Sequence, residues 1–115
     1  MAHASKMPRP GAIFSAVIKT VEERKRNMPE KSYVATLLRG GADAILCKLA
    51  EETGEVIKAA REETREKQVQ ELCDLFFHAM VLMAHKEIPF EEIEVELARR
   101  HGISGLEEKA TRKKA

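Results

Sequence analysis

Three carboxylates gather within five positions of one segment, KLAEETGEVIKAA, which runs from Lys48 to Ala60. They are Glu51, Glu52 and Glu55, and the apolar residues around them have the spacing of a helix. Like charges three or four residues apart on a helix repel one another. Such a cluster therefore points to a compensating positive partner, and a bound cation is one chemistry that would supply it.

A second pair of acids lies in the next predicted helix. Between Glu71 and His85 the only polar residues are Glu71, Asp74, His78 and His85, and all four fall within about 60° of arc on a helix that is otherwise apolar. A carboxylate on a helix buried on most sides is costly unless it is compensated. Lysine and arginine could compensate it, or a divalent cation could. Oxygen ligands favour a hard ion, so we expect Mg²⁺, with Mn²⁺ as the alternative.

Two other interpretations of these residues stay open. Acids at helical spacing are most often a solvated face, although the apolar surroundings of Glu71 and Asp74 argue against that here. A carboxylate-bridged iron centre uses Glu-x-x-His pairs on two helices. The fit is poor, because Asp74 and His78 are four residues apart and the preceding helix has no histidine. We expect the histidines to bond a backbone group or cap the acid seam.

Helices must position these acids. The chain has 115 residues, of which 43% are hydrophobic and 34% charged, as expected for one helix-rich domain. We predict an all-α fold of roughly four helices and find no strand-like alternation. A short helical or irregular piece, VATLLRGG, precedes the second helix, for which Asp43 is the expected N-cap. The predicted helices are Ala12–Arg26, Asp43–Glu63, Glu66–Lys86 and Pro89–His101.

We divide the chain into three parts. Residues 1–10 are predicted to be a mobile N-terminal arm, residues 11–112 a single all-α domain, and residues 113–115 a polar tail. The polar stretch after Gly102 is expected to form about one helical turn.

The apolar residues make two predictions about burial. On the second helix one face should pack in the core, and its members are Ile45, Leu46, Leu49, Val56, Ile57 and Ala60. The third helix is apolar over about 260° of arc, more than a small monomer can cover. We therefore expect a bundle completed by oligomerisation, a homodimer or a higher homo-oligomer.

Charge and composition exclude several classes of protein. The net charge of +1 offers no basic excess for a nucleic-acid backbone. No apolar run suggests a signal peptide or a membrane span. Cys47 and Cys73 lie in helical patterns, where we expect small buried groups rather than a disulfide. The expected compartment is the reducing cytoplasm.

The order of the motifs is similar to that of a known family. EExxE followed on the next helix by ExxD resembles the MazG-like superfamily of all-α nucleotide pyrophosphohydrolases. The blocks EERKRNMPEKSYVATLL, KLAEETGEVIKAA, ELCDLFFHAMVLMA and LARRHGISGLEEKATR resemble successive blocks of the phosphoribosyl-ATP pyrophosphohydrolase family and cover roughly residues 20–112. The resemblance implies Mg²⁺-dependent hydrolysis of phosphoribosyl-ATP to phosphoribosyl-AMP and pyrophosphate, the second step of histidine biosynthesis. It places the metal ligands at Glu52, Glu55, Glu71 and Asp74.

The remaining candidate residues follow from this chemistry. Mg²⁺ would offset the charge of the polyphosphate and lower the pKa of a bound water, and Glu51 is the candidate general base. Nearby cations would stabilise charge on the phosphate oxygens. The candidates for that role are Arg24, Lys25, Lys31 and Lys48. The family pattern also implies that Ser32 and Tyr33 touch the ribose or the base.

Two rival functions remain at this point. A house-cleaning pyrophosphohydrolase for modified or excess nucleotides would share the acid motif and the metal, although the loop and tail blocks argue against it. A non-enzymatic helical dimerisation or adaptor module would explain the apolar third helix. It would leave Glu71 and Asp74 without a purpose on that helix.

Overall fold

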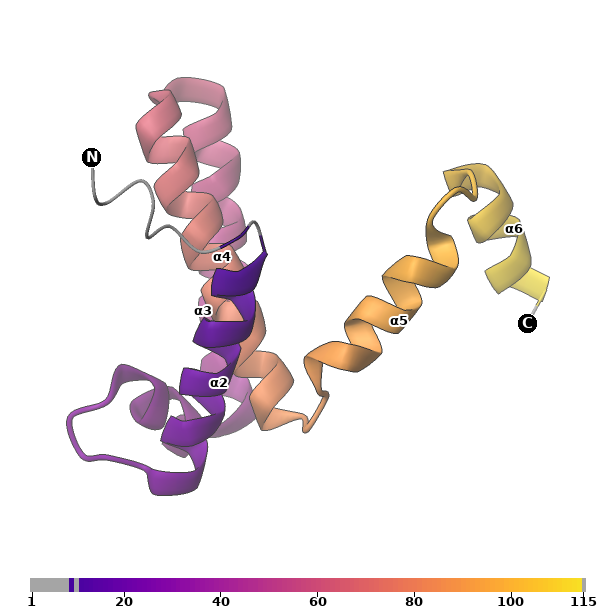
Figure 1. Ribbon diagram of the computed structural model, residues 1–115. Coiled ribbons are helices and arrows are strands. Elements are labelled where there is room, and N and C mark those ends of the chain that lie inside the picture. The colour runs from indigo at the N-terminus through magenta and orange to yellow at the C-terminus, as the bar shows by residue number, and fades with distance from the viewer. Residues whose placement is uncertain (1–8, 10, 115) are drawn as a thin grey trace.

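The computed structural model describes residue 9 and residues 11–114, so the predicted N-terminal arm lies outside the described residues except for Arg9. Every regular element in the described part is an α-helix, which confirms the all-α prediction (Figure 1). None of these helices is long and apolar enough to cross a membrane. The five helices are α2 (Ala12–Asn27), α3 (Tyr33–Glu62), α4 (Arg65–His85), α5 (Phe90–Arg100) and α6 (Gly105–Lys114).

Helix α3 begins ten residues earlier than expected, so the predicted N-cap at Asp43 is wrong. The actual N-cap is Ser32, whose side-chain oxygen accepts a hydrogen bond from the Ala35 amide at 3.1 Å. The short piece before Asp43 is helical and continues into the long helix through a kink at Gly41, which has φ 79° and ψ −171°. A glycine can adopt this conformation, so the chain changes direction at Gly41 and then continues as a helix.

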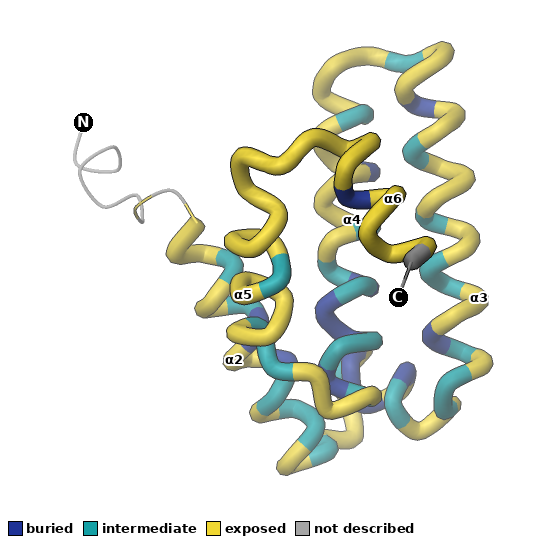
Figure 2. The backbone as a smooth tube through the Cα atoms, turned by 90° about the vertical axis from the view of Figure 1, so that its right-hand side faces the viewer, coloured by how far each residue is buried: buried dark blue, intermediate teal, exposed yellow. Residues whose placement is uncertain are grey.

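Helices α3 and α4 form an antiparallel hairpin, and α2 packs beside it (Figure 1). Only two residues separate α3 from α4, and one of them, Thr64, caps α4 by accepting from the Lys67 amide at 3.2 Å. The core lies where the three helices meet, as Figure 2 shows by the buried segments. Its three largest fully buried side chains, Val21, Ile45 and Val81, come one from each helix.

The predicted core face of α3 is correct only in part. Ile45 is fully buried and Leu49 and Val56 are half-buried, but the other three predicted members, Leu46, Ile57 and Ala60, are exposed. Ala59 is buried in place of Ala60. The reason is that one chain supplies a partner for only one side of α3, which leaves part of its apolar arc open.

The prediction that both cysteines are buried is wrong. Cys47 and Cys73 are free thiols, and both are exposed. Cys47 lies on α3, and Cys73 lies on α4, where it lines an open groove between α4 and α2.

Helices α5 and α6 extend away from the body of the molecule (Figure 1). No residue of α5 is buried. The two helices are joined mainly by charge: Glu108 of α6 lies 2.5 Å from Arg99 and 3.9 Å from Arg100 of α5. The bond from Arg99 lowers the pKa of the Glu108 carboxyl and keeps it ionised. Helix α6 has ten residues, so the expectation of a single turn was too short.

Two glycines of α3 provide a matched test of the kink. Gly41→Ala should lower the free energy of unfolding by about 1–3 kcal/mol, because an L-residue is strained at that φ and ψ. Gly54→Ala should raise it by about 0.5–1 kcal/mol, because Gly54 is helical and an added Cβ meets no atom within 4 Å. Urea unfolding of the two variants measures the difference. Effects of the same sign would show that the kink is not required.

Candidate functional site

The structure brings together three of the predicted acids. Carboxylate oxygens of Glu52 on α3 and of Glu71 and Asp74 on α4 lie within 4.8 Å of one another. We call these three residues the acid cluster. The i,i+3 spacing places Glu71 and Asp74 on one face of α4, and the hairpin turns that face toward Glu52. Glu71 is only 6% exposed, whereas Asp74 is exposed, so the cluster is buried at one end and open at the other.

The acid cluster has the donor set and the spacing for a hard divalent cation. Mg²⁺ binds oxygen at about 2.1 Å, so oxygens on opposite sides of the ion are about 4.2 Å apart. Small side-chain rotations would bring oxygens spread over 4.8 Å to that separation. The exposed side, at Asp74, leaves room for water and phosphate oxygens. These residues therefore fit Mg²⁺ or Mn²⁺.

Glu55 and Glu51, the other two predicted acids, lie outside the cluster. Glu55 is exposed one turn along α3 from Glu52. Glu51 is also exposed and pairs with Lys48 at 3.0 Å. Their predicted roles, metal ligand and general base, stay predictions.

Two lysines sit against the acids. The Lys48 ammonium lies 3.7 Å from Glu52, in addition to its bond with Glu51, and the Lys67 ammonium lies 3.1 Å from Glu71. The hydrogen bond with Glu51 is the main cause of a raised pKa at Lys48, and that with Glu71 is the main cause of the raised pKa at Lys67. Both lysines therefore stay protonated at neutral pH. They offset the acids only in part, because each is more than a third exposed and exposed pairs are weak.

Lys67 was missed in the sequence analysis. The spacing could have identified it, because Lys67 precedes Glu71 by four residues, the separation at which opposite charges meet on a helix. Lys48, which was predicted as a substrate contact, does lie beside the acid cluster.

A tyrosine and a histidine adjoin the acid cluster. The Tyr33 hydroxyl lies 2.8 Å from Nε2 of His78, and Nδ1 of His78 lies 2.7 Å from the carbonyl oxygen of Asp74. The expectation that this histidine bonds a backbone group is therefore confirmed. Ser32, predicted to touch substrate beside Tyr33, serves as the cap of α3, and this cap places Tyr33 at the first position of the helix.

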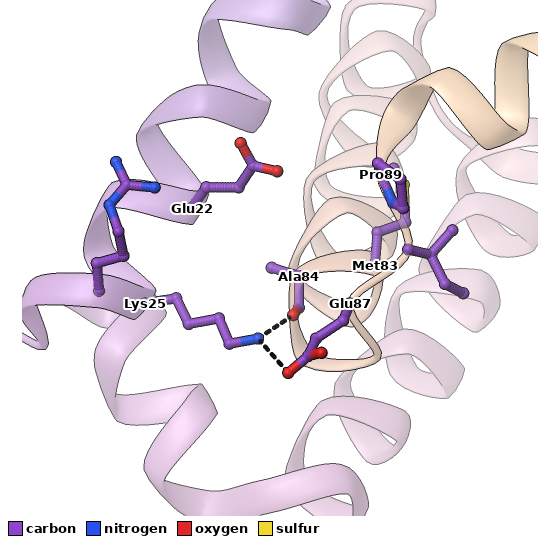
Figure 3. A pocket seen from close by; sticks show the side chains of 8 residues that line it. Glu22, Lys25, Met83, Ala84, Glu87 and Pro89 are labelled. Atoms are coloured by element: carbon purple, nitrogen blue, oxygen red, sulfur yellow. Dashed lines mark hydrogen bonds and ion pairs between the residues drawn. The ribbon is translucent and has the colours of Figure 1, made fainter.

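The other predicted cations lie in different surroundings. Figure 3 shows Lys25 donating to the Ala84 carbonyl at 2.7 Å, with Glu87 at 3.6 Å. Ala84 is ten residues after Asp74, which on a helix is about 15 Å away. These side chains line a groove of about 540 Å³, which shares no residue with the acid cluster. Arg24 is half-buried on α2, and Lys31 is exposed in the following turn.

The fold and the site define an all-α protein with a carboxylate site built on a helix hairpin. The sequence profile described as phosphoribosyl-ATP pyrophosphohydrolase matches residues 14–101. The chain belongs to the phosphoribosyl-ATP pyrophosphohydrolase family, as the resemblance of its motifs predicted.

Curated relatives match over nearly their whole length. The chain is 46% identical to "Phosphoribosyl-ATP pyrophosphatase" of Neisseria meningitidis serogroup B over 101 residues, 88% of this chain and 94% of the relative. The protein of the same name from Geobacter metallireducens is 48% identical over 102 residues, 89% of this chain and 94% of the relative. That from Chromobacterium violaceum is 44% identical over 101 residues, 88% and 94% of the two chains.

Removing Lys67 should expose the repulsion within the acid cluster. We expect Lys67→Gln to lower the free energy of unfolding in EDTA slightly, because Glu71 loses its partner beside two other carboxylates. Millimolar Mg²⁺ should raise the melting temperature of this variant more than that of the wild type. Lys19→Gln, at an exposed position on α2, is the control. An equal response of both lysine variants to Mg²⁺ would show that Lys67 does not compensate the cluster.

Proposed function

We propose that the chain hydrolyses phosphoribosyl-ATP to phosphoribosyl-AMP and pyrophosphate in a Mg²⁺-dependent reaction, the second step of histidine biosynthesis. The observation that carries the proposal is the acid cluster, which provides oxygen ligands at the spacing a small divalent cation needs. Membership of the family supports phosphoribosyl-ATP as the substrate, because the chain covers more than nine-tenths of the length of these relatives.

Each acid has a place in this reaction. Glu52, Glu71 and Asp74 would hold the ion, and Glu55 would complete the set after a rotation of its exposed side chain. When bound, the ion supplies positive charge to the polyphosphate and lowers the pKa of a coordinated water. Glu51 borders Glu52 and faces solvent, so its carboxylate is available to accept the proton of that water.

Lysine and arginine side chains would then hold the phosphates. Lys48 is the best placed, because it lies beside both Glu51 and Glu52 and its raised pKa keeps it charged. Arg24 on α2 and Lys31 in the turn before α3 are the further candidates. Lys25 would first have to leave Ala84 and Glu87.

The two rival functions explain less of the site. An adaptor module has no use for three carboxylates brought together between two helices. A house-cleaning pyrophosphohydrolase would use the acid cluster equally well, so substrate choice is what separates it from the proposal.

Product analysis tests the proposal directly. The protein is incubated with phosphoribosyl-ATP, ATP and a set of dNTPs, with and without Mg²⁺, and the products are identified by mass. We expect phosphoribosyl-AMP and pyrophosphate, formed only with the metal. Turnover of dNTPs alone would favour the house-cleaning function, and no turnover at all would favour the adaptor.

Removing one charge at a time tests the acid cluster. Glu52→Gln, Glu71→Gln and Asp74→Asn should each lower activity by at least roughly 100-fold, about 2.7 kcal/mol of barrier. Stability without metal should stay level or rise, because each change relieves repulsion and leaves no buried lysine unpaired. Glu91→Gln, at an exposed position on α5, is the matched control and should keep full activity. Full activity in Asp74→Asn would contradict a metal site at this cluster.

The proposed assembly is a homodimer or a larger homo-oligomer. An apolar groove of about 380 Å³ runs between α2 and α4, and its lining includes Phe14, Phe76 and Met80. Phe76 is about half exposed, as are Val69 on the same helix and Ile57 on α3. A chain this small rarely leaves so much apolar surface to water unless a partner covers it.

The same proposal places the enzyme in the reducing cytoplasm, which would keep its two exposed thiols free.

Sedimentation at micromolar concentration measures this assembly. We expect a dimer or a larger species for the wild type and a shift toward monomer for Phe76→Glu, which places a charge on the apolar face. Lys19→Gln, which lowers the net charge by the same one unit at an exposed position, serves as the control. A wild-type monomer at these concentrations would contradict the proposal.

A further inference from the structure

His78 is a buried polar residue to which the proposed reaction gives no role. It is 5% exposed, and both of its ring nitrogens have partners. One partner is a backbone carbonyl of its own helix, at Asp74, and the other is Tyr33 at the start of α3. The ring therefore ties the first residue of α3 to the part of α4 that carries the acid cluster.

The two bonds determine where the protons lie. The Asp74 carbonyl can only accept, so Nδ1 of His78 must be the donor in that bond. In the neutral ring Nε2 then has a lone pair and no hydrogen. The Tyr33 hydroxyl must consequently donate its proton to Nε2. This leaves the Tyr33 oxygen with lone pairs only, so it can accept a further hydrogen bond but cannot donate one.

Tyr33 is placed to use those lone pairs. Its ring packs against Phe77 at a centroid distance of 6.3 Å and meets His78 edge-on at 5.7 Å, yet the residue remains 49% exposed. It is also close enough to Lys48 to contribute to the raised pKa of that lysine. Tyr33 is thus linked through His78 to the backbone of Asp74, a member of the acid cluster, with its hydroxyl held in one direction and part of its surface open.

We propose that His78 is a positioning residue that makes Tyr33 an acceptor-only contact for a hydrogen-bond donor on the nucleoside part of the substrate, such as a ribose hydroxyl. Phosphate oxygens are acceptors, so this contact would exclude the polyphosphate and help set which end of the substrate lies over Tyr33. The inference rests on the proposed function for the identity of the substrate. The contact between His78 and Tyr33 itself does not depend on it.

The chain offers a direct readout of that contact. Tyr33 is its only tyrosine and it has no tryptophan, so the intrinsic fluorescence reports this residue alone. A tyrosine that donates to a strong acceptor emits weakly. At about pH 8, where an ordinary histidine is neutral, His78→Leu and His78→Asn should raise the emission by about twofold or more. His78→Gln should stay close to the wild type, because its amide oxygen can reach the position of Nε2.

Kinetics with phosphoribosyl-ATP separate positioning from a merely structural role. His78→Asn keeps a donor for the Asp74 carbonyl but removes the acceptor for Tyr33, whereas His78→Gln does the reverse. We expect KM to rise roughly tenfold in His78→Asn and in Tyr33→Phe, with kcat changed by less than about threefold, and to recover in His78→Gln. Inhibition by pyrophosphate alone should be unchanged in all three. A double variant that combines His78→Asn with Tyr33→Phe should be no worse than either single change.

Opposite results would overturn the inference. Unchanged tyrosine emission in His78→Leu would show that the histidine does not hold the hydroxyl, whatever the substrate is. Additive effects in the double variant, or weaker pyrophosphate inhibition in Tyr33→Phe, would show that Tyr33 does not act through His78 on the nucleoside end. A wild type that leaves phosphoribosyl-ATP intact would instead overturn the proposed function, and the emission would still decide whether His78 holds Tyr33.

Discussion

Three carboxylates held within 4.8 Å of one another between two helices are the constraint on which the rest of this structure depends. Their mutual repulsion opposes the close approach of α3 and α4, so other contacts must hold the hairpin together. The apolar core does this on one side, with Ile45 and Val81 fully buried. At the end of the hairpin, the two-residue turn and its Thr64 cap hold the two helices together. Lys48 and Lys67 reduce the repulsion without cancelling it, so the cluster keeps the negative charge that the proposed cation would offset.

The main features of the fold were predictable because they depend on local pattern. Apolar periodicity found both ends of α2, α4 and α5 to within one residue, and the acids at i,i+3 on α4 were correctly expected to share a face. The start of α3 was not found. Gly40 and Gly41 resemble a helix stop, and only the three-dimensional packing shows that the backbone kinks at Gly41 and continues.

The site was predictable in outline and less so in detail. The two acidic patterns, joined by a short turn, sufficed to expect a seam of five carboxylates between the helices. The structure brings together only Glu52, Glu71 and Asp74, and leaves Glu51 and Glu55 outside the cluster. The bond from Lys25 to Ala84 spans 59 residues of the chain and that between His78 and Tyr33 spans 45, and no local pattern encodes contacts of that kind. The exposed cysteines were missed for a related reason: an apolar helix predicts burial, but a single chain need not supply everything that buries it.

Helix α6 is attached to α5 mainly by ion pairs, so its attachment depends on the salt concentration of the solvent. Ion pairs of Glu108 with Arg99 and Arg100 join α6 to α5, and Leu106 of α6 is 83% exposed. Attraction between charges is screened by dissolved ions over about 8 Å at physiological ionic strength and over about 3 Å at 1 M, whereas the apolar core of the hairpin is strengthened by many salts. Concentrated salt should therefore loosen the C-terminal end of the molecule while it stabilises the core, so the two regions respond to salt in opposite directions.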